Sequence, residues 1–311
     1  NLDLDFYIID KSTIESKNTI TKENNKINIS ELLCEKNLNS IRNSIVNNKG
    51  TFTVPEFDVI QKALGFKIVK GGNSTQKSDI VLDIQNEDIN KQNEGFGIKS
   101  FLGSKPTLLN ASGNTNFIFR IDNFDDSKIN EVNKINTRTK LKDRIIFIEK
   151  FGGSFKYLGA EKENMEHNLK ISDSLMPNVI GHILISFYKK RISEISKIVN
   201  EIHKVGELNS EISYGEKSSL IIKIKRLLID ILLGFFAGKK WDGNYLANGT
   251  IVMKKSGDCV GFHIIDSKSL KDYLFESIRL DTPSTTRHRF GKIYKEKDGK
   301  LYFKLNLQLR F

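Results

Sequence analysis

The sequence predicts a mixed α/β protein, with a central mixed sheet flanked by helices, because the spacing of apolar residues changes twice along the chain. Between residues 66 and 109, short apolar stretches of strand character alternate with polar turns. Residues 170–236 instead repeat apolar residues at helical spacing. From residue 237 onward, strand-like stretches return around one short helix. With 311 residues, the chain is long enough to bury a substantial core.

These changes of pattern divide the sequence into three segments. Residues 1–154 form a core with strands, residues 155–236 are helical, and residues 237–311 form a basic region of mixed α and β character. No internal repeat or long linker interrupts them. In the first segment the pattern predicts one helix or a pair of short helices at 29–48, a helix at 55–64, and strands at 66–70, 77–85, 95–102, 116–121 and 141–150.

The second and third segments carry elements of both kinds. Residues 172–205 and 218–236 have the apolar period of helices, and the latter stretch is apolar nearly all round, as in a core helix. In the third segment we expect strands at 241–255 and 258–266, a short helix at 269–280, a loop at 281–291 and a hairpin at 292–311.

Positive charge is concentrated towards the end of the sequence. The net charge is +11, and residues 239–311 hold 15 Lys and Arg against 8 Asp and Glu, which places +7 in this last quarter. Such a basic surface favours an anionic partner, above all a nucleic acid. A basic solvated face is the alternative interpretation of the same composition.

Composition also argues against several classes of protein. The two cysteines, Cys34 and Cys259, are far apart and lack metal-binding spacing, so neither a disulfide framework nor a zinc site is expected. No signal peptide is visible, and the longest apolar run is too short to span a bilayer. We therefore expect a protein of the bacterial cytoplasm with no membrane partner. The sequence begins with Asn rather than Met, which leaves open whether a segment precedes it.

Asp79 and Lys99 are the candidate catalytic residues of the first segment. Asp79 enters one predicted strand and Lys99 lies inside the next, a separation that suits neighbouring strands. Phosphodiester hydrolysis needs a hard cation held by carboxylates, a water nucleophile, and a positive group near that water. Nucleases of the PD-(D/E)XK type supply these groups from an aspartate and an acid-X-Lys triplet on adjacent strands. Here the triplet is Gly97-Ile98-Lys99, so its acid is missing.

Several carboxylates are candidates for the missing metal ligand. Asp83 shares a strand face with Asp79 by the period of two, about 13 Å further along, and is taken as a catalytic and metal-binding candidate beside it. Glu94, just before the lysine strand, Glu56, in a predicted helix, or a preceding segment are the other sources. The spacing of Asp79 and Lys99 alone favours a simpler interpretation, a turn residue and an edge-strand lysine without catalysis.

The loop at 281–291 is rich in hydroxyl and cationic side chains. Arginine can donate two hydrogen bonds to the O6 and N7 atoms of guanine, and short hydroxyls suit phosphate oxygens. A polar surface loop without a ligand is the alternative. The residues predicted to contact DNA are Ser284, Thr285, Thr286, Arg287, His288 and Arg289.

Three passages of the sequence resemble the HpaII-like family of type II restriction endonucleases. They are KSDIVLDI with GFGIKSFLGSKPTLLNASGNTNF, then KKWDGN, then LDTPSTTRHRFGKIYKEKDGKLYFKLNLQLRF, and the likeness spans about residues 50–311. The resemblance implies a PD-(D/E)XK nuclease core and Mg²⁺-dependent cleavage of both strands of a short palindromic DNA site, which is CCGG in the family's namesake. It also implies that Asp79 binds the metal and that Lys99 is catalytic.

The family is similar in placing a small residue where the triplet's acid would stand, so Gly97 is not evidence of inactivation. It also includes an N-terminal helical segment with a Gly-Glu pair, which nothing in this sequence matches. Double-stranded DNA is the expected partner. A homodimer is the simplest assembly for cutting a palindromic site. The family also implies a cognate DNA methyltransferase.

We therefore expect a type II restriction endonuclease that leaves 5′-phosphate and 3′-hydroxyl ends. A DNA-binding protein on a decayed nuclease scaffold is the main alternative, and it predicts salt-sensitive binding without cleavage. A nuclease that acts on RNA or branched DNA is a third possibility, which competition between substrates would distinguish.

Overall fold

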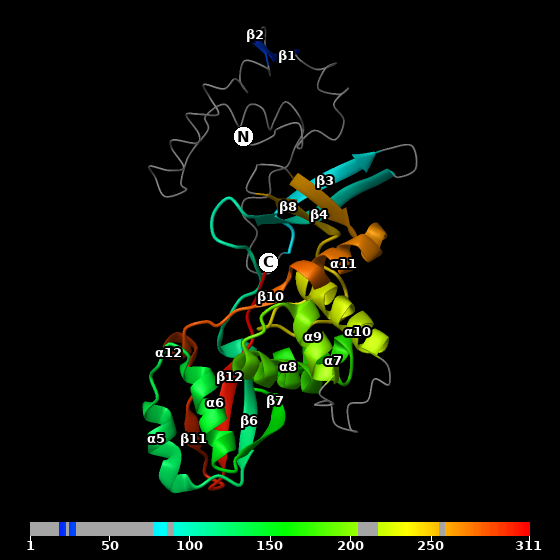
Figure 1. The fold of residues 1–311 in the computed structure, drawn as a ribbon. Coiled ribbons are helices and arrows are strands. Elements are labelled where there is room, and N and C mark those ends of the chain that lie inside the picture. The colour runs from blue at the N-terminus through cyan, green and yellow to red at the C-terminus, as the bar shows by residue number, and fades with distance from the viewer. Residues whose placement is uncertain (1–18, 23–24, 29–76, 86–89, 205–216, 255–258) are drawn as a thin grey trace. The chain divides into compact units, whose positions relative to one another are not determined.

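The computed structural model describes most of the chain, in residues 19–22, 25–28, 77–85, 90–204, 217–254 and 259–311 (Figure 1). The helical stretches predicted at 29–48 and 55–64 and the strand predicted at 66–70 lie outside these ranges. None of the helices within the described ranges is long and apolar enough to cross a bilayer.

Two compact units make up the chain. The first contains residues 1–104 and 247–262, and the second contains residues 105–246 and 263–311. The chain thus leaves the first unit, forms most of the second, and returns to complete the sheet of the first. These limits differ from the three predicted segments, whose boundaries at residues 154 and 236 remain a prediction.

A four-stranded mixed sheet forms the described part of the first unit, in the order β3-β4-β8-β9. Strand β3 runs antiparallel to β4, whereas β4 and β8 run parallel. A separate hairpin joins β1 and β2. The bounds of these strands are β1 Thr19–Lys22, β2 Asn25–Asn28, β3 Ile80–Gln85, β4 Asn90–Ser100, β8 Gly249–Met253 and β9 Cys259–His263.

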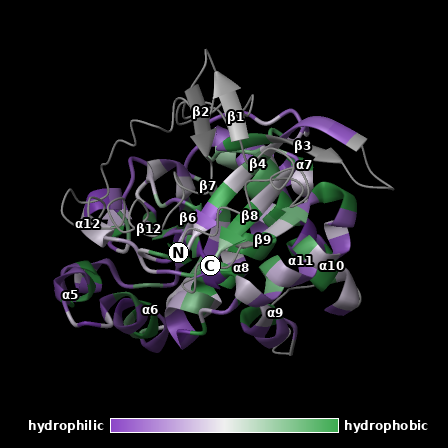
Figure 2. Ribbon diagram, turned by 90° about the horizontal axis from the view of Figure 1, so that it is seen from above, coloured by the Kyte–Doolittle hydropathy of each residue, from purple (hydrophilic) through white to green (hydrophobic). Residues whose placement is uncertain are grey.

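Strand β8 explains why the parallel pairing forms here. All five of its residues are buried, and most of the strand carries hydrophobic colours in Figure 2. Parallel strands are buried on both faces and therefore read as continuous apolar runs, as Ile251, Val252 and Met253 do. Its register pairs Gly97 of β4 with Thr250 and Lys99 with Val252. This register places the candidate catalytic strand between β3 and β8.

An antiparallel sheet in the order β11-β12-β6-β7 forms the centre of the second unit. Alternate residues of β12 are buried, and Phe303 of β12 faces Phe119 of β6 in the register. A smaller sheet has the order β10-β13-β5. The strands are β5 Thr107–Leu109, β6 Asn116–Asp122, β7 Ser154–Ala160, β10 Arg279–Leu280, β11 Ile293–Lys295, β12 Leu301–Asn306 and β13 Leu309–Arg310.

Helices of the second unit pack against its antiparallel sheet, and α8 is the most buried of the long ones. Pro177 stands in its first turn, where a proline is tolerated, and Arg191 ends it in the left-handed conformation. The α-helices are α5 Ile129–Lys134, α6 Lys140–Lys150, α7 Glu163–Ser172, α8 Met176–Lys190, α9 Ile195–Lys204, α10 Lys217–Ile229, α11 Ser267–Ser277 and α12 Thr285–His288. Short 3₁₀ helices lie at Gly113–Thr115, Asp126–Lys128 and Ile264–Asp266, and a π-helix at Asp230–Gly234 continues α10.

The mixed α/β class is confirmed, while several individual elements differ from the predictions. The strand predicted at 141–150 is helix α6, because Leu141, Ile145 and Ile148 are buried at helical spacing, which the apolar run IIFI concealed. Strand β7 follows where no strand was predicted. The predicted loop at 281–291 contains the short helix α12.

Candidate active site and nucleic-acid interface

Asp79 lies where the chain enters β3, opposite Gly97 in the register that pairs Ile80 with Phe96. Its backbone N–H donates to the Phe96 carbonyl (2.7 Å), and its carboxylate Oδ2 accepts a hydrogen bond from the Ile98 N–H (2.7 Å). The carboxylate is therefore held in place by the neighbouring strand. Among the described residues, no hydrogen bond is formed to its other oxygen, Oδ1.

Lys99 lies two residues beyond Gly97 on β4. Because side chains alternate along a strand, Lys99 is on the face of the sheet that carries Asp79. The pKa of the Lys99 ammonium lies below its usual value, since burial disfavours the charged form more than the Asp79 carboxylate favours it. The structure thus brings the two predicted catalytic residues to one face of adjacent strands.

Gly97 stands at a close approach of two backbone segments. A Cβ atom at this position would lie 2.8 Å from the Lys77 carbonyl oxygen and 3.9 Å from Asp79 Oδ2. From the parallel strand, the Thr250 hydroxyl donates a hydrogen bond to the Gly97 carbonyl (2.8 Å). The acid of the usual triplet therefore has no room at this position unless the chain at Lys77 moves.

Lys77 is a second amine at this site that the sequence interpretation did not single out. Burial, and then the positive charge of Lys99, lower its pKa to about 7. The signal was present in the sequence, because Lys77 precedes Asp79 by the strand period of two within KSDIVLDI. The described site thus combines two lysines with one carboxylate.

The source of the second acidic ligand remains a prediction. Glu94 occupies the opposite face of β4 from Gly97 by alternation, which disfavours it. Asp83 lies in β3 four residues beyond Asp79, where the register to β4 shifts, and the structure does not describe its side chain. Glu56 lies outside the described ranges.

The described residues contain no complete cluster of metal ligands. In this part of the chain, no group of three or more His, Cys, Asp or Glu residues is placed to hold a metal ion. Asp79 with its open Oδ1 fits one position in the coordination of a hard cation. Asp83 as a metal ligand remains a prediction.

The predicted DNA-contacting residues, Ser284 to Arg289, lie on and around α12 in the second unit. Ser284 caps this helix by accepting a hydrogen bond from the Arg287 N–H (3.3 Å). Thr286, Arg287 and Arg289 are exposed. Burial, and then the charge of Arg287, lower the pKa of His288, so this imidazole favours its neutral form. The helix therefore presents a mixture of hydroxyl and guanidinium groups to solvent.

Hydrogen bonds with residues of the antiparallel sheet hold the backbone at the end of α12. The His288 carbonyl accepts a hydrogen bond from the Asn116 side-chain amide (3.0 Å), and the Gly291 N–H donates to the Lys304 carbonyl (2.9 Å). Asn306 in turn donates to the Asn116 side-chain oxygen (2.7 Å). The side-chain amides of Asn116 and Asn306, called the buried amide anchor below, thus hold the backbone at the end of α12, while some side chains of this helix are exposed.

Two cavities flank α12. The larger, of about 630 Å³, is lined by Thr285, Thr286 and Arg289 together with residues of other elements. The smaller, of about 440 Å³, is lined by Ser284, Thr285 and Thr286 among others. Arg287 and His288 line neither cavity. The predicted residues therefore form part of a larger surface. The larger cavity, called the cationic cavity below, is also lined by Asn133, Asn136, Lys140, Arg144, Phe290, Lys292, Tyr294 and Lys304.

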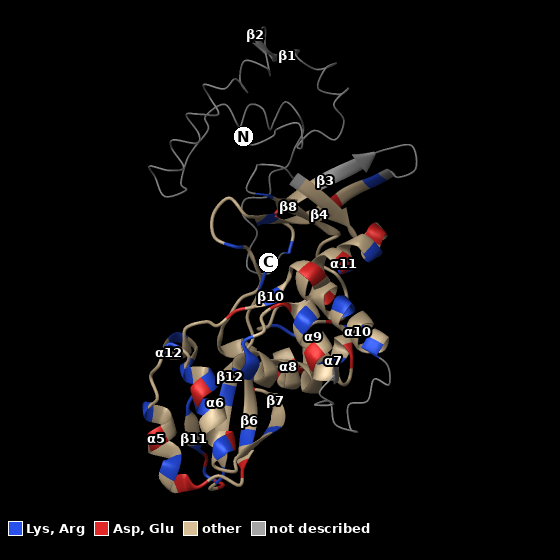
Figure 3. Ribbon diagram, viewed as in Figure 1, with Lys and Arg blue, Asp and Glu red and all other residues tan. Residues whose placement is uncertain are grey.

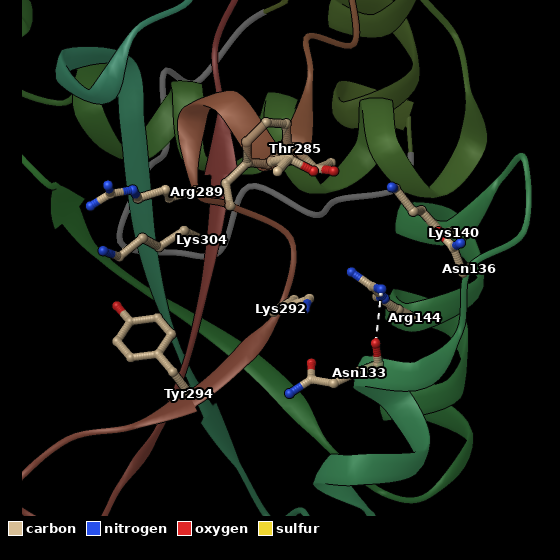
Figure 4. Close-up of a pocket in the computed structure, with 11 residues that line it drawn as sticks. Asn133, Asn136, Lys140, Arg144, Thr285, Arg289, Lys292, Tyr294 and Lys304 are labelled. Atoms are coloured by element: carbon tan, nitrogen blue, oxygen red, sulfur yellow. Dashed lines mark hydrogen bonds between the residues drawn. The ribbon is translucent and has the colours of Figure 1, made fainter.

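Figure 4 shows two walls of the cationic cavity. Asn136 and Lys140 lie on one side, while Arg289 and Lys304 lie on the other with Tyr294 below them. Lys and Arg are also frequent on the surrounding ribbon, at α12 and β11 (Figure 3). No Asp or Glu is among the lining residues. The cavity therefore suits an anionic ligand.

Arg144 holds the wall formed by α5 and α6 against the chain that follows α12. Its side chain is 3% exposed. Its guanidinium donates to the carbonyl oxygens of Asn133 (3.1 Å), Ile135 (2.6 Å) and Gly291. Burial lowers its pKa. This network explains how segments more than a hundred residues apart share one cavity.

Sequence reasoning missed the contribution of residues 133–144 to this surface. The segment carried little signal, because Arg144 follows Lys142 and Asp143 directly before the apolar run at 145–148 and so belongs to a charged stretch. The significance of Arg144 depends on the helix that replaced the predicted strand, since only the helical period turns Arg144 inward beside Leu141 and Ile145.

Comparison with known proteins agrees with these features. The family model described as HpaII restriction endonuclease matches residues 1–311. The type II restriction enzyme HpaII of Haemophilus parainfluenzae is 33% identical over 276 residues, which cover 88% of this chain and 75% of the relative. No solved structure matches the chain significantly. This chain belongs to the HpaII restriction endonuclease family and is a site-specific deoxyribonuclease.

Proposed function

We propose that this restriction endonuclease hydrolyses both strands of a short palindromic DNA site with the help of Mg²⁺, and that the site is CCGG as in the family's namesake. The observation that carries the catalytic part is the placement of Asp79 and Lys99 on one face of β3 and β4. A PD-(D/E)XK core is the fold that this arrangement favours. The basic surface around α12 supplies the DNA-binding part.

Asp79 would hold Mg²⁺ through Oδ1, because Oδ2 already accepts the Ile98 N–H. Bound Mg²⁺ would neutralise the non-bridging phosphate oxygens. Lys99 would orient or deprotonate the attacking water from the same face of the sheet. Asp83, four residues beyond Asp79 on β3, stays a candidate for a further acidic ligand.

The hydrolysis would proceed by in-line attack. A water oxygen forms a new bond to phosphorus and loses its proton, while the bond from phosphorus to the 3′ oxygen breaks. The leaving oxygen takes up a proton from solvent. The products are a 5′-phosphate and a 3′-hydroxyl end. A two-fold homodimer would place one such site on each strand of a palindrome, and a cognate methyltransferase would protect the host's own sites.

Digestion of plasmid DNA with and without Mg²⁺ tests this function. Discrete fragments whose ends map to CCGG are expected, and Asp79→Asn and Lys99→Ala should each reduce the rate by about a hundredfold or more. Lys91→Ala, an exposed lysine on the same strand as Lys99, is the matched control and should cut like the parent. Mutants of Asp79 and Lys99 that cut at the parental rate would remove the catalytic assignment.

A DNA-binding protein on a decayed nuclease scaffold is the second candidate. It is favoured by one observation, the crowding at Gly97, which leaves no room for the triplet's acid two residues before Lys99. This candidate predicts binding that weakens with salt and no cleavage in Mg²⁺, Mn²⁺ or Co²⁺. Discrete digestion products in any of these metals would exclude it.

A further inference from the structure

The cationic cavity beside α12 has more positive charge than its surroundings balance. Lys140, Arg289 and Lys292 line it, and none of these three forms an ion pair or hydrogen bond with its side chain among the described residues. Arg144 donates only to carbonyl oxygens, through its two terminal nitrogens, and these neutral partners leave its positive charge uncompensated. Lys304 is the exception, because it pairs with Glu161 (2.8 Å).

The geometry of the two walls fits an elongated anion better than a small one. Lys140 lies on the wall formed by α6, and Arg289 lies on the opposite wall (Figure 4). Lys292 follows the left-handed turn at Gly291, whose φ of 82° directs the chain past α6. Cations on separated walls of one cavity can contact successive charges along a polymer at the same time.

We propose that the cationic cavity binds the phosphate backbone of DNA, with Lys140, Arg289 and Lys292 contacting phosphate oxygens. Arg144 is a positioning residue that keeps the two walls together. The inference rests on the proposed function for its ligand, DNA. It assigns Lys140 and Lys292 to the interface and gives Arg289 a backbone contact, while the exposed Arg287, outside the cavity, remains available for base edges.

Contacts to the phosphate backbone of DNA differ from contacts to bases in how they depend on salt and on DNA sequence. Each neutralised phosphate contributes about −0.9 to the slope of log K against log salt concentration, whatever the DNA sequence. Removing a base contact instead weakens binding to the cognate site alone. Salt titrations with two duplexes therefore separate the two roles.

The experiment measures binding by fluorescence anisotropy in EDTA, with one duplex that contains CCGG and one with a scrambled site, over a series of salt concentrations. Lys140→Ala and Lys292→Ala should each weaken binding to both duplexes by about threefold to tenfold and reduce the salt slope by about one. Lys297→Ala is the matched control, because this lysine is exposed on the turn before β12 and lies outside the cavity.

Slopes for Lys140→Ala and Lys292→Ala that equal the Lys297→Ala slope would overturn the proposal, and so would a loss confined to the CCGG duplex. Thermal melting of each variant identifies any that has lost its fold, and Lys140→Gln and Lys292→Gln then replace the alanine variants. The parent's plasmid digest, run in parallel, reports separately on the proposed function. If the parent protein binds DNA with the expected salt slopes but does not cut it, the proposed nuclease function is refuted, while the proposal that the cationic cavity binds DNA stands.

Discussion

The Asp79–Lys99 site of the first unit and the cationic cavity of the second unit differ in structure, in line with the different roles proposed for them. At the first, β3, β4 and β8 fix a few groups within one strand spacing of each other, and even a Cβ atom at Gly97 has no room. At the second, cations from α6, the turn after α12 and β12 surround about 630 Å³ of open space. Hydrolysis requires exact placement of few groups, whereas DNA binding sums many weak contacts.

This contrast predicts that single substitutions act strongly at the first site and weakly at the second. Substitutions at the Asp79–Lys99 site should change the rate of cleavage, whereas substitutions at the cationic cavity should change the affinity for DNA. The four changes below probe it in order of decreasing effect.

Replacing Gly97 should have the largest effect. Gly97→Asp would restore the acid of the usual triplet, yet its Cβ would press on the Lys77 carbonyl and displace the strand that carries Lys99. We expect cleavage to fall by about a hundredfold, since a displacement of about 1 Å can cost that much. The rate of plasmid cleavage under single-turnover conditions measures it.

Gly97→Ala should lower cleavage as well, because the clash begins at Cβ. Gly103→Ala is the control, since nothing lies within 4 Å of a Cβ built there. Faster cleavage by Gly97→Asp than by the parent would show that the chain at Lys77 yields and that the missing acid limits the reaction.

Arg144→Ala should affect stability more than any other change in the cavity wall. It leaves the carbonyl oxygens of Asn133, Ile135 and Gly291 without their buried donor, which we expect to lower the free energy of unfolding by about 2 kcal/mol. Urea unfolding measures this change. Arg138→Ala, at an exposed position of the same segment, should leave stability within about 0.5 kcal/mol of the parent; equal losses in both variants would contradict the role of Arg144.

Arg287→Ala should weaken binding to the cognate duplex by about tenfold, the cost of one lost base contact. The scrambled duplex should bind as before, because Arg287 lies outside the cationic cavity. Anisotropy titrations with both duplexes make the comparison, and Arg289→Ala is the matched variant that should weaken both. A uniform loss for Arg287→Ala would assign this residue to phosphate positioning instead.

Glu161→Gln should have the smallest effect, and it should strengthen binding. The substitution removes the carboxylate that pairs with Lys304 and so frees one more cation at the cavity. We expect affinity for both duplexes to rise by about threefold at low salt and this gain to vanish at high salt. Glu131→Gln, on α5, serves as the control; a gain of equal size there would point to net charge alone.

The sequence allowed Asp79 and Lys99 to be placed on adjacent strands because strand alternation is local, and β3 and β4 are joined by a short connection. It did not allow the parallel partner β8 to be found, since nothing near Gly97 encodes a pairing with Thr250. The reason for Gly97 itself became visible only with the Lys77 carbonyl beside it.

The surface proposed to bind DNA could be inferred from the sequence only in part. Composition was enough to single out the loop containing Arg287 and Arg289, because clustered cations and hydroxyls are visible in one short stretch. Lys140 and Arg144 reach the same cavity through tertiary packing of α6, which was predicted as a strand. Contacts between distant segments follow from packing that periodicity alone does not specify.

The buried amide anchor beneath α12 has a consequence for how such enzymes change their targets. Asn116 and Asn306 hold the backbone at His288 through internal hydrogen bonds, and none of these bonds involves the side chains of Thr286 or Arg287. Evolution can therefore vary these two positions while the supporting frame stays intact. A combinatorial library at the same two positions, selected for cutting a different palindrome, would begin from a scaffold that tolerates the exchange.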